Sequence, residues 1–221
     1  MKSIVIEKNI LKNNNEIASK IRSALNDKGI YTINMIGSPG SGKTSVLEQI
    51  IKHINRKFNI AVIEGDLYTT KDAERIENQG INVVQLNTEG ACHLDANMIE
   101  QALDCIDINN ADLLVIENVG NLVCPASYDL SEDSKILVMS VTEGHDKPLK
   151  YPSMFQKAEV LILNKIDLVR YTNFDIGDFY KDVKSLNEHI HIFEISCTSG
   201  KGVQKLCDYL EGQIMSKGVN R

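Results

Sequence analysis

From residue 31 onward, short runs rich in β-branched residues alternate with segments of helical periodicity. Several runs are continuously apolar, which is typical of strands covered on both faces. Alternating strands and helices predict a mostly parallel, doubly wound sheet of about seven strands in a three-layer α/β fold. The predicted strands are residues 31–36, 59–64, 81–86, 112–117, 135–141, 159–164 and 191–196, and the predicted helices 43–57, 71–79, 95–107, 175–188 and 202–215.

One more helix is predicted before the first strand, over residues 9–28. Its apolar side chains fall on roughly one stripe, which would pack on the sheet edge or on a partner. We therefore divide the chain into an N-terminal helical extension, residues 1–30, and a main α/β domain, residues 31–221. The predicted stripe is formed by Ile10, Ile17, Ile21, Ala24 and Leu25.

Composition narrows the function classes. The 221 residues are 43% hydrophobic and 24% charged, which is ordinary for a globular protein with a full core. The net charge of −6 and the scattered basic residues argue against nucleic acid as a partner. The first residues, MKSIVIEKN, lack the apolar stretch of a signal peptide, and no apolar run approaches the length of a membrane span. Five cysteines without a disulfide framework favour reduced thiols and a cytoplasmic location.

The sequence GSPGSGKTS follows the first predicted strand. It fits the P-loop pattern Gly-x-x-x-x-Gly-Lys-Ser/Thr between a strand and a helix, and predicts a P-loop NTPase. Glycines let backbone N–H groups point at phosphate oxygens, and the helix N-terminus adds positive partial charge. The lysine would reach the β- and γ-phosphates, and the threonine would bind Mg²⁺. The predicted nucleotide-binding residues are Gly37, Ser38, Gly40, Ser41, Gly42, Lys43, Thr44 and Ser45.

A guanine-reading motif ends the sixth predicted strand. Asn164, Lys165 and Asp167 have the Asn-Lys-x-Asp spacing of GTPases. The aspartate would accept hydrogen bonds from guanine N1–H and N2–H₂, whereas adenine offers no such donor pair. In the loop after the last strand, Ser196 and Cys197 are small enough for close approach to the base, and we interpret Cys197 as a spacer rather than a metal ligand. GTP and GDP are therefore the predicted nucleotides.

Carboxylates at two other strand ends predict a magnesium site. Asp66 and Asp72 follow the second strand, and Glu117 ends the fourth. Beside a P-loop such groups suit Mg²⁺ and the attacking water. We therefore predict a hydrolytic role for Asp66, Asp72 and Glu117 together with Lys43. Thr44, Asp66 and Glu117 are the predicted Mg²⁺ ligands, while a first-turn helix charge remains an alternative for Asp72.

The segment after the fourth strand is similar to a GTPase switch. Gly120 lies three residues after Glu117, which resembles the Asp-x-x-Gly motif with glutamate in place of aspartate. The next residue is Asn121 and not the glutamine that orients water in Ras-like enzymes. We therefore expect slow intrinsic GTP hydrolysis.

A second metal site is indicated by Cys92, His93 and Cys124. The first two follow the third strand, and Cys124 lies seven residues beyond Glu117. Because ligands gather at the carboxyl ends of parallel strands, the three side chains would share the nucleotide face. Two thiolates and an imidazole suit Zn²⁺ or Ni²⁺, and a two-fold dimer would complete the coordination. The spacing is equally compatible with the absence of a metal site, in which case Cys92 and Cys124 would be small hydrophobic residues and His93 a solvated loop residue.

Two other cysteines and one charged segment are predicted to have structural roles and no part in metal binding. Cys105 and Cys207 fall on predicted helices, where we expect both to be part of the core. Residues 142–152, TEGHDKPLKYP, are predicted to form a charged loop in which His145 is solvated.

In order, the segments GSPGSGKTS, EGDLYTTKDAERI, GACHLDA, ENVGNLVCP, VTEGHDKPLKYP and NKIDL resemble HypB, the hydrogenase nickel-incorporation GTPase family. The resemblance covers nearly the whole chain from Tyr31. It implies that Cys92, His93 and Cys124 bind metal at the interface of a GTP-dependent homodimer. It also implies that Lys147 and Lys150 lie near the nucleotide or the second subunit. The implied partners are a HypA-type nickel chaperone and a hydrogenase large-subunit precursor.

The sequence differs from some HypB proteins and from the related UreG family in its metal-binding motifs, and other functions remain as alternatives. The first cysteine is Cys92 and the first histidine is His53, so we expect no N-terminal nickel-storage tract. The urease accessory family UreG has a Cys-Pro-His triplet, whereas Cys124-Pro125 is followed here by Ala126. The alternatives are a GTPase metallochaperone for another nickel enzyme such as urease, a P-loop small-molecule kinase, and a metal-storage module with a structural nucleotide.

Overall fold

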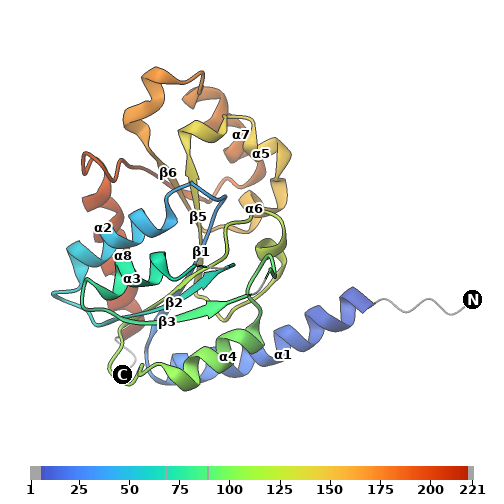
Figure 1. Ribbon diagram of the computed structural model, residues 1–221. Helices are drawn as coiled ribbons and strands as arrows, with labels where there is room; N and C mark the ends of the chain where they lie inside the picture. The colour runs from blue at the N-terminus through green and yellow to red at the C-terminus, as the bar shows by residue number, and fades with distance from the viewer. Residues whose placement is uncertain (1–5, 68, 89, 219–221) are drawn as a thin grey trace, which may run out of the picture.

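The structure, a computed structural model, describes residues 6–67, 69–88 and 90–218. Within these residues seven parallel strands form one sheet in the order β3-β2-β4-β1-β5-β6-β7 (Figure 1). The predicted parallel α/β fold is confirmed, and every predicted strand end lies within two residues of the observed one. The strands are β1 Tyr31–Ile36, β2 Ile60–Asp66, β3 Asn82–Asn87, β4 Leu113–Glu117, β5 Ser134–Ser140, β6 Val160–Asn164 and β7 His191–Glu194.

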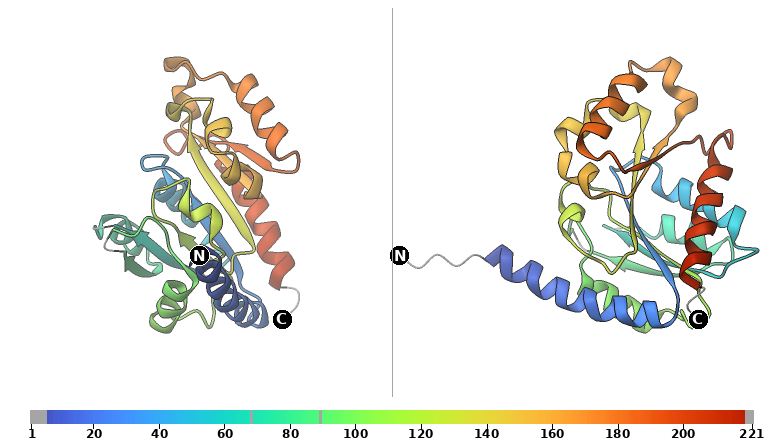
Figure 2. Two further views of the ribbon diagram at one scale, coloured as in Figure 1. Left: turned by 90° about the vertical axis from the view of Figure 1, so that its right-hand side faces the viewer. Right: turned by 180° about the vertical axis from the view of Figure 1, so that it is seen from behind.

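Helices cover both faces of this sheet, which gives the three predicted layers (Figure 2). The α-helices are α1 Ile6–Asp27, α2 Lys43–Ile54, α3 Lys71–Glu77, α4 Ala96–Cys105, α5 Lys147–Lys150, α6 Pro152–Lys157, α7 Ile176–Leu186 and α8 Val203–Gly218. The 3₁₀ helices are η1 Cys124–Ser127, η2 Val141–Glu143 and η3 Ile166–Tyr171.

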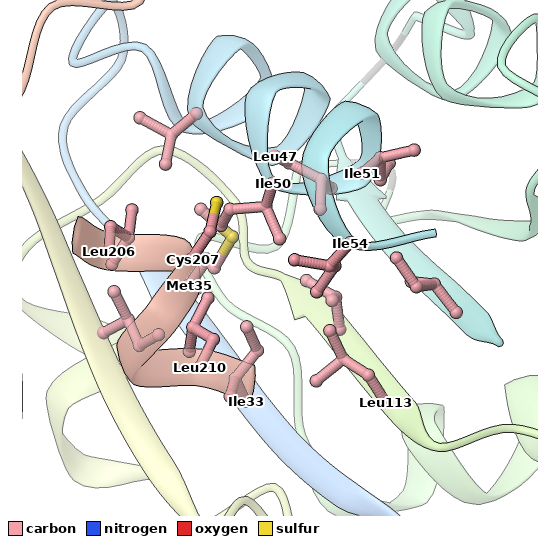
Figure 3. Close-up of a cluster of buried hydrophobic side chains, with 14 of the residues drawn as sticks. Ile33, Met35, Leu47, Ile50, Ile51, Ile54, Leu113, Leu206, Cys207 and Leu210 are labelled. Atoms are coloured by element: carbon pink, nitrogen blue, oxygen red, sulfur yellow. The ribbon is translucent and has the colours of Figure 1, made fainter. Parts of the chain in front are cut away.

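The face of the sheet under α2 and α8 buries the largest core (Figure 3). Strict alternation along the strands places Ile33 and Met35 of β1 on this face, so that they pack against the aliphatic side chains of α2. Cys207 of α8 is fully buried there, which confirms its predicted place in the core.

Cys105 does not occupy the predicted core position, because its side chain is exposed. It is the last residue of α4, and the following residue, Ile106, is already extended and 5% exposed. The chain therefore leaves the helix at the point where the apolar side chain turns inward, and Cys105 faces solvent.

Helix α1 packs along α4 on the opposite face of the sheet (Figure 2). Ile21 and Leu25 are buried as predicted, whereas Ile10 is 51% exposed and Ala24 is exposed. Hydrogen bonds of a buried polar residue explain why the buried side of α1 differs from the predicted apolar stripe. The buried Asn14 donates from Nδ2 to Asp129 O and accepts at Oδ1 from Ala96 N, which turns its side of α1 toward α4.

The proposed boundary at residue 30 stays a prediction, and its outer ends, residues 1–5 and 219–221, lie outside the described residues. Among the helices that the structure describes, none is long and apolar enough to cross a bilayer.

The prediction of a charged loop over residues 142–152 is wrong. The segment forms η2, α5 and the start of α6. Pro148 and Pro152 stand in the first turn of α5 and α6, where the fixed φ of proline favours helix initiation. His145 is half-buried: its ring packs edge-on against Phe174, and its Nδ1 accepts a hydrogen bond from Asp175 N.

Candidate functional site

The P-loop connects the central strand β1 to α2. Gly42 has φ +95°, and a Cβ at this position would lie 2.5 Å from Nδ2 of Asn164, so only glycine fits. Lys43 is buried, and its Nζ lies 3.5 Å from Gly37 O, which accepts its hydrogen bond. The loop therefore has the tight turn and the inward lysine that phosphate binding requires.

A cavity of about 460 Å³ opens beside this loop. It is lined by most of the predicted phosphate-binding residues and by all of the predicted magnesium ligands, from the ends of β2 and β4 and the start of α2. The described lining residues include Gly40, Gly42, Lys43, Thr44, Ser45, Glu64, Asp66, Asp72, Arg75, Glu117, Asn118 and Lys165. Among the described residues, Gly37, Ser38 and Ser41 belong to the loop without lining the cavity.

Two buried carboxylates face the start of α2. Thr44 Oγ1 donates a 2.8 Å hydrogen bond to Glu117 Oε1. Glu64 is the register partner of Glu117 on the neighbouring strand, and each is 2% exposed. Within the described residues, Oε2 of both glutamates has no hydrogen-bond partner. Unpaired buried carboxylate oxygens beside a P-loop are suited to a hard divalent cation such as Mg²⁺.

Burial raises the pKa of Glu64 to about 8, and the negative charge of Glu117 adds to this shift. Burial also raises the pKa of Glu117 to about 7, although Lys43 and the hydrogen bond from Thr44 act against it. Two carboxyl groups of like charge that are held close together with little solvent are costly to ionise at the same time. The pair is therefore electrostatically incomplete without a cation.

Glu64→Gln is expected to stabilise the nucleotide-free protein more at pH 8 than at pH 5. The folded pKa of Glu64 is about 8 against an ordinary 4.5, so the destabilisation grows as the pH rises between these values. The neutral amide removes it. Because 1 kcal/mol corresponds to about 2–4 °C in a chain of this size, the unfolding midpoint should rise by at least about 2 °C at pH 8. Thermal unfolding at both pH values measures the effect.

The exposed Glu100 of α4 supplies the control substitution, Glu100→Gln. Equal shifts for Glu64→Gln at the two pH values would contradict the electrostatic explanation.

Glu64 was missed by the sequence prediction. Its signal is a carboxylate placed directly after the apolar run 60–63 while the strand is still buried, so that it is buried whichever face it takes. Glu64, Asp66 and Asp72 also have carboxylate oxygens within 4.8 Å of one another. Asp72 pairs with Arg75 at 2.8 Å, and Arg75 binds Glu48 of α2, so Asp72 has a structural ion pair at the edge of the cavity.

The Asn-Lys-x-Asp loop is bonded to the P-loop. Asn164 Nδ2 donates to Ser41 O at 3.1 Å, and Lys165 Nζ donates to Gly40 O at 2.7 Å. Lys165 has φ +60°, the left-handed conformation that turns the chain into η3. Asp167 is exposed at the start of η3. Strand β6 therefore ends in a loop that lies directly beside the P-loop, where the predicted guanine-reading residues would need to be.

The loop after β7, which was predicted to back the base, packs against Asn164 and α2. Ser196 is fully buried, and its Oγ accepts from Ser199 N. Cys197 Sγ lies 3.5 Å from Asn164 Oδ1, and Cys197 O accepts from Gln49 Nε2. Burial raises the pKa of the Cys197 thiol to about 11. A thiol held protonated beside Asn164 fits the predicted spacer better than a metal ligand.

Cys92, His93 and Cys124 come together at the same edge of the sheet. One ligand atom of each lies within 4.8 Å of the others. The two Sγ atoms are 2.8 Å apart, and Cys92 Sγ is 3.6 Å from His93 Nδ1. The His93 ring stacks on Tyr128 with centroids 3.9 Å apart. Two thiols and an imidazole in this arrangement are a soft donor set for Ni²⁺ or Zn²⁺.

A metal ion would have to displace a proton from this cluster in order to bind, so its binding should weaken as the pH falls. The pKa of Cys92 is raised, chiefly because its thiol donates a hydrogen bond to Cys124 and also because of burial. Burial lowers the pKa of His93, so the imidazole is neutral at pH 7 and ready to coordinate.

Lys147 and Lys150 do not line the nucleotide cavity among the described residues. Lys147 pairs with Glu143 at 3.5 Å and lies over the Tyr151 ring, and Lys150 pairs with Asp146 at 2.5 Å. Both lysines are therefore engaged by residues that flank α5. Their predicted action near the nucleotide or across an interface stays a prediction.

The sheet order, the P-loop and the adjoining base loop define a P-loop nucleotide-binding protein. Residues 31–194 match the family model of the CobW/HypB/UreG nucleotide-binding domain. The chain belongs to the HypB family of hydrogenase maturation factors.

Relatives support this placement over nearly the full length of the chain. Hydrogenase maturation factor HypB of Escherichia coli K12 is 44% identical, with 94% of this chain and 72% of that protein covered. Hydrogenase/urease maturation factor HypB of Helicobacter hepaticus is 41% identical, with 95% and 88% covered. The crystal structure of Helicobacter pylori HypB in complex with nickel superimposes with a TM-score of 0.87 at 38% identity, covering 92% and 96%.

Proposed function

We propose that this chain is a GTP-hydrolysing metallochaperone that binds nickel, or zinc, and assists nickel insertion during [NiFe]-hydrogenase maturation. The observation that carries the proposal is the convergence of Cys92, His93 and Cys124, with ligand atoms within 4.8 Å, beside a P-loop cavity. The nickel complex of the H. pylori relative supports nickel as the cargo. Family membership leaves the alternative of a small-molecule kinase without support.

In the proposed hydrolysis, Lys43 binds the β- and γ-phosphates of GTP. Thr44, Asp66 and Glu117 would hold Mg²⁺, and the unpaired oxygen of Glu64 supports adding it to this set. When bound, the cation neutralises charge on the phosphate oxygens. Asp72 would orient water or Mg²⁺ from the cavity edge. Because Asn121 replaces the water-orienting glutamine, the proposed intrinsic rate is slow.

The metal site would respond to the nucleotide through the segment after β4. Glu117 ends that strand in the cavity, and Cys124 follows seven residues later. A γ-phosphate that reorganises this segment would move one thiol relative to Cys92. Linkage then requires that nickel changes GTP affinity by the same factor by which GTP changes nickel affinity.

A GTP-dependent homodimer would complete the metal coordination, since three ligands fill only part of a tetrahedral site. Val123, next to Cys124, is 61% exposed, and this apolar side chain favours a contact at the metal face. The further proposed partners are a HypA-type nickel chaperone and the hydrogenase large-subunit precursor in the cytoplasm. Neither nucleic acid nor a membrane has a part in this proposal.

Nickel titration in two nucleotide states tests the proposal. With GDP and with a non-hydrolysable GTP analogue, the dissociation constants for Ni²⁺ should differ by about 5–150-fold. Isothermal titration calorimetry measures both. Cys92→Ala and Cys124→Ala should abolish the high-affinity binding in either state.

The exposed Cys105 offers a matched control, because Cys105→Ala removes a thiol that lies on α4. Its nickel affinity should remain that of the unsubstituted chain. Identical nickel affinities with GDP and analogue would refute the coupling, and full binding by Cys124→Ala would refute the site.

A second candidate recipient is urease, since the H. hepaticus relative is a hydrogenase/urease maturation factor. The metal chemistry would be the same, and only the recipient enzyme would differ. Nickel transfer assayed in parallel to apo-hydrogenase and apo-urease separates the two recipients.

A further inference from the structure

Asn121 makes contacts on three sides between the P-loop and the two thiols. Its backbone forms an isolated antiparallel bridge with Gly37, the first residue of the P-loop. Its side-chain Nδ2 donates to Cys92 O at 3.1 Å, and its Oδ1 accepts from Val123 N at 2.9 Å. One side chain therefore bonds the carbonyl of the first cysteine and the residue that precedes the second.

These contacts matter because the two cysteines lie on separate irregular segments. Cys92 is exposed in the turn between β3 and α4, and Cys124 begins the short helix η1, 32 residues later. No strand pairing joins the two turns in the described residues. A metal site on such segments needs supporting bonds to keep its ligands at a fixed separation.

We propose that Asn121 is the positioning residue that holds the Cys92 and Cys124 thiols at metal-binding separation and ties them to the P-loop. The inference rests on the proposed function and adds to it a residue that contacts neither metal nor nucleotide. Asparagine suits this task because its short planar amide carries one donor face and one acceptor face. Aspartate has no donor for Cys92 O, and alanine has neither group.

Ni²⁺ titration of the GDP-bound full chain tests the role of Asn121, with thiolate-to-nickel charge-transfer absorption as the readout. Asn121→Ala should weaken nickel binding about 10-fold or more, the usual effect of losing a group that supports a ligand. Asn121→Asp should also weaken it, although its added negative charge alone would attract a cation. Asn97→Ala, an exposed asparagine of α4, should bind nickel as the unsubstituted chain does. GDP affinity should stay unchanged in all three variants.

The outcomes separate the inference from the proposed function. If the unsubstituted chain shows no thiolate–nickel band, the proposed function fails and the positioning role fails with it. If that band is present and Asn121→Ala binds nickel equally well, the positioning role alone is overturned. A parallel loss of GDP and nickel affinity in Asn121→Ala would also overturn it, because the residue would then support the P-loop and not the thiols.

Discussion

Lys43→Ala is expected to lower the rate of GTP hydrolysis by about 10²–10³-fold, the usual cost of removing one preorganised charge from a transition state. Lys43 is buried at the first turn of α2, with Nζ directed back at the P-loop carbonyl of Gly37. Its charge also opposes the raised pKa values of Glu64 and Glu117. The substitution thus removes the positive charge that stabilises both the bound phosphates and the two buried carboxylates. Phosphate release at saturating GTP and Mg²⁺ measures the effect.

Lys52→Ala is the matched control, because Lys52 is an exposed lysine on the last turn of the same helix. It should hydrolyse GTP at the unsubstituted rate. Circular dichroism shows whether both variants retain their helices. Hydrolysis by a folded Lys43→Ala variant at the rate of Lys52→Ala would contradict the assigned role of Lys43.

The fold was predictable because most of its central strands are buried on both faces. Runs such as residues 160–163 are uniformly apolar and fully buried, so they stand out from their surroundings without any knowledge of neighbours. Helix ends were harder, since they depend on tertiary contacts. Ile106 leaves α4 to reach the core, and this single turn exposes Cys105. Proline-initiated α5 and α6 are too short to show helical periodicity.

The candidate site was predictable where residue order alone places side chains. Parallel strands bring the segments after β3 and β4 to one edge, so the meeting of Cys92 with Cys124 follows from topology. Glu64 and Asn121 could not be found in the same way. Glu64 matters because of its register opposite Glu117, and Asn121 because of the carbonyl that its amide reaches. Both depend on pairings between distant segments.

Asp167→Asn is expected to change the preferred nucleotide from guanine to xanthine. The carboxylate would accept from guanine N1–H and N2–H₂, two charge-assisted hydrogen bonds whose loss weakens GTP binding by about 10²–10⁴-fold. Xanthine carries a carbonyl in place of the N2 amine. The asparagine Oδ1 would accept from N1–H, and its Nδ2 would donate to that carbonyl. Competition of GTP, XTP and ATP against a fluorescent nucleotide measures the three affinities.

The geometry of the loop favours this exchange over a general loss of binding. Asn164 and Lys165 bond the P-loop carbonyls of Ser41 and Gly40, and Asp167 is exposed without taking part in those bonds. Asp178→Asn, on an exposed aspartate of α7, should leave the preference for GTP unchanged. If Asp167→Asn loses GTP affinity without gaining XTP affinity, the aspartate does not read the base edge. If the unsubstituted chain binds ATP as tightly as GTP, the site does not select guanine.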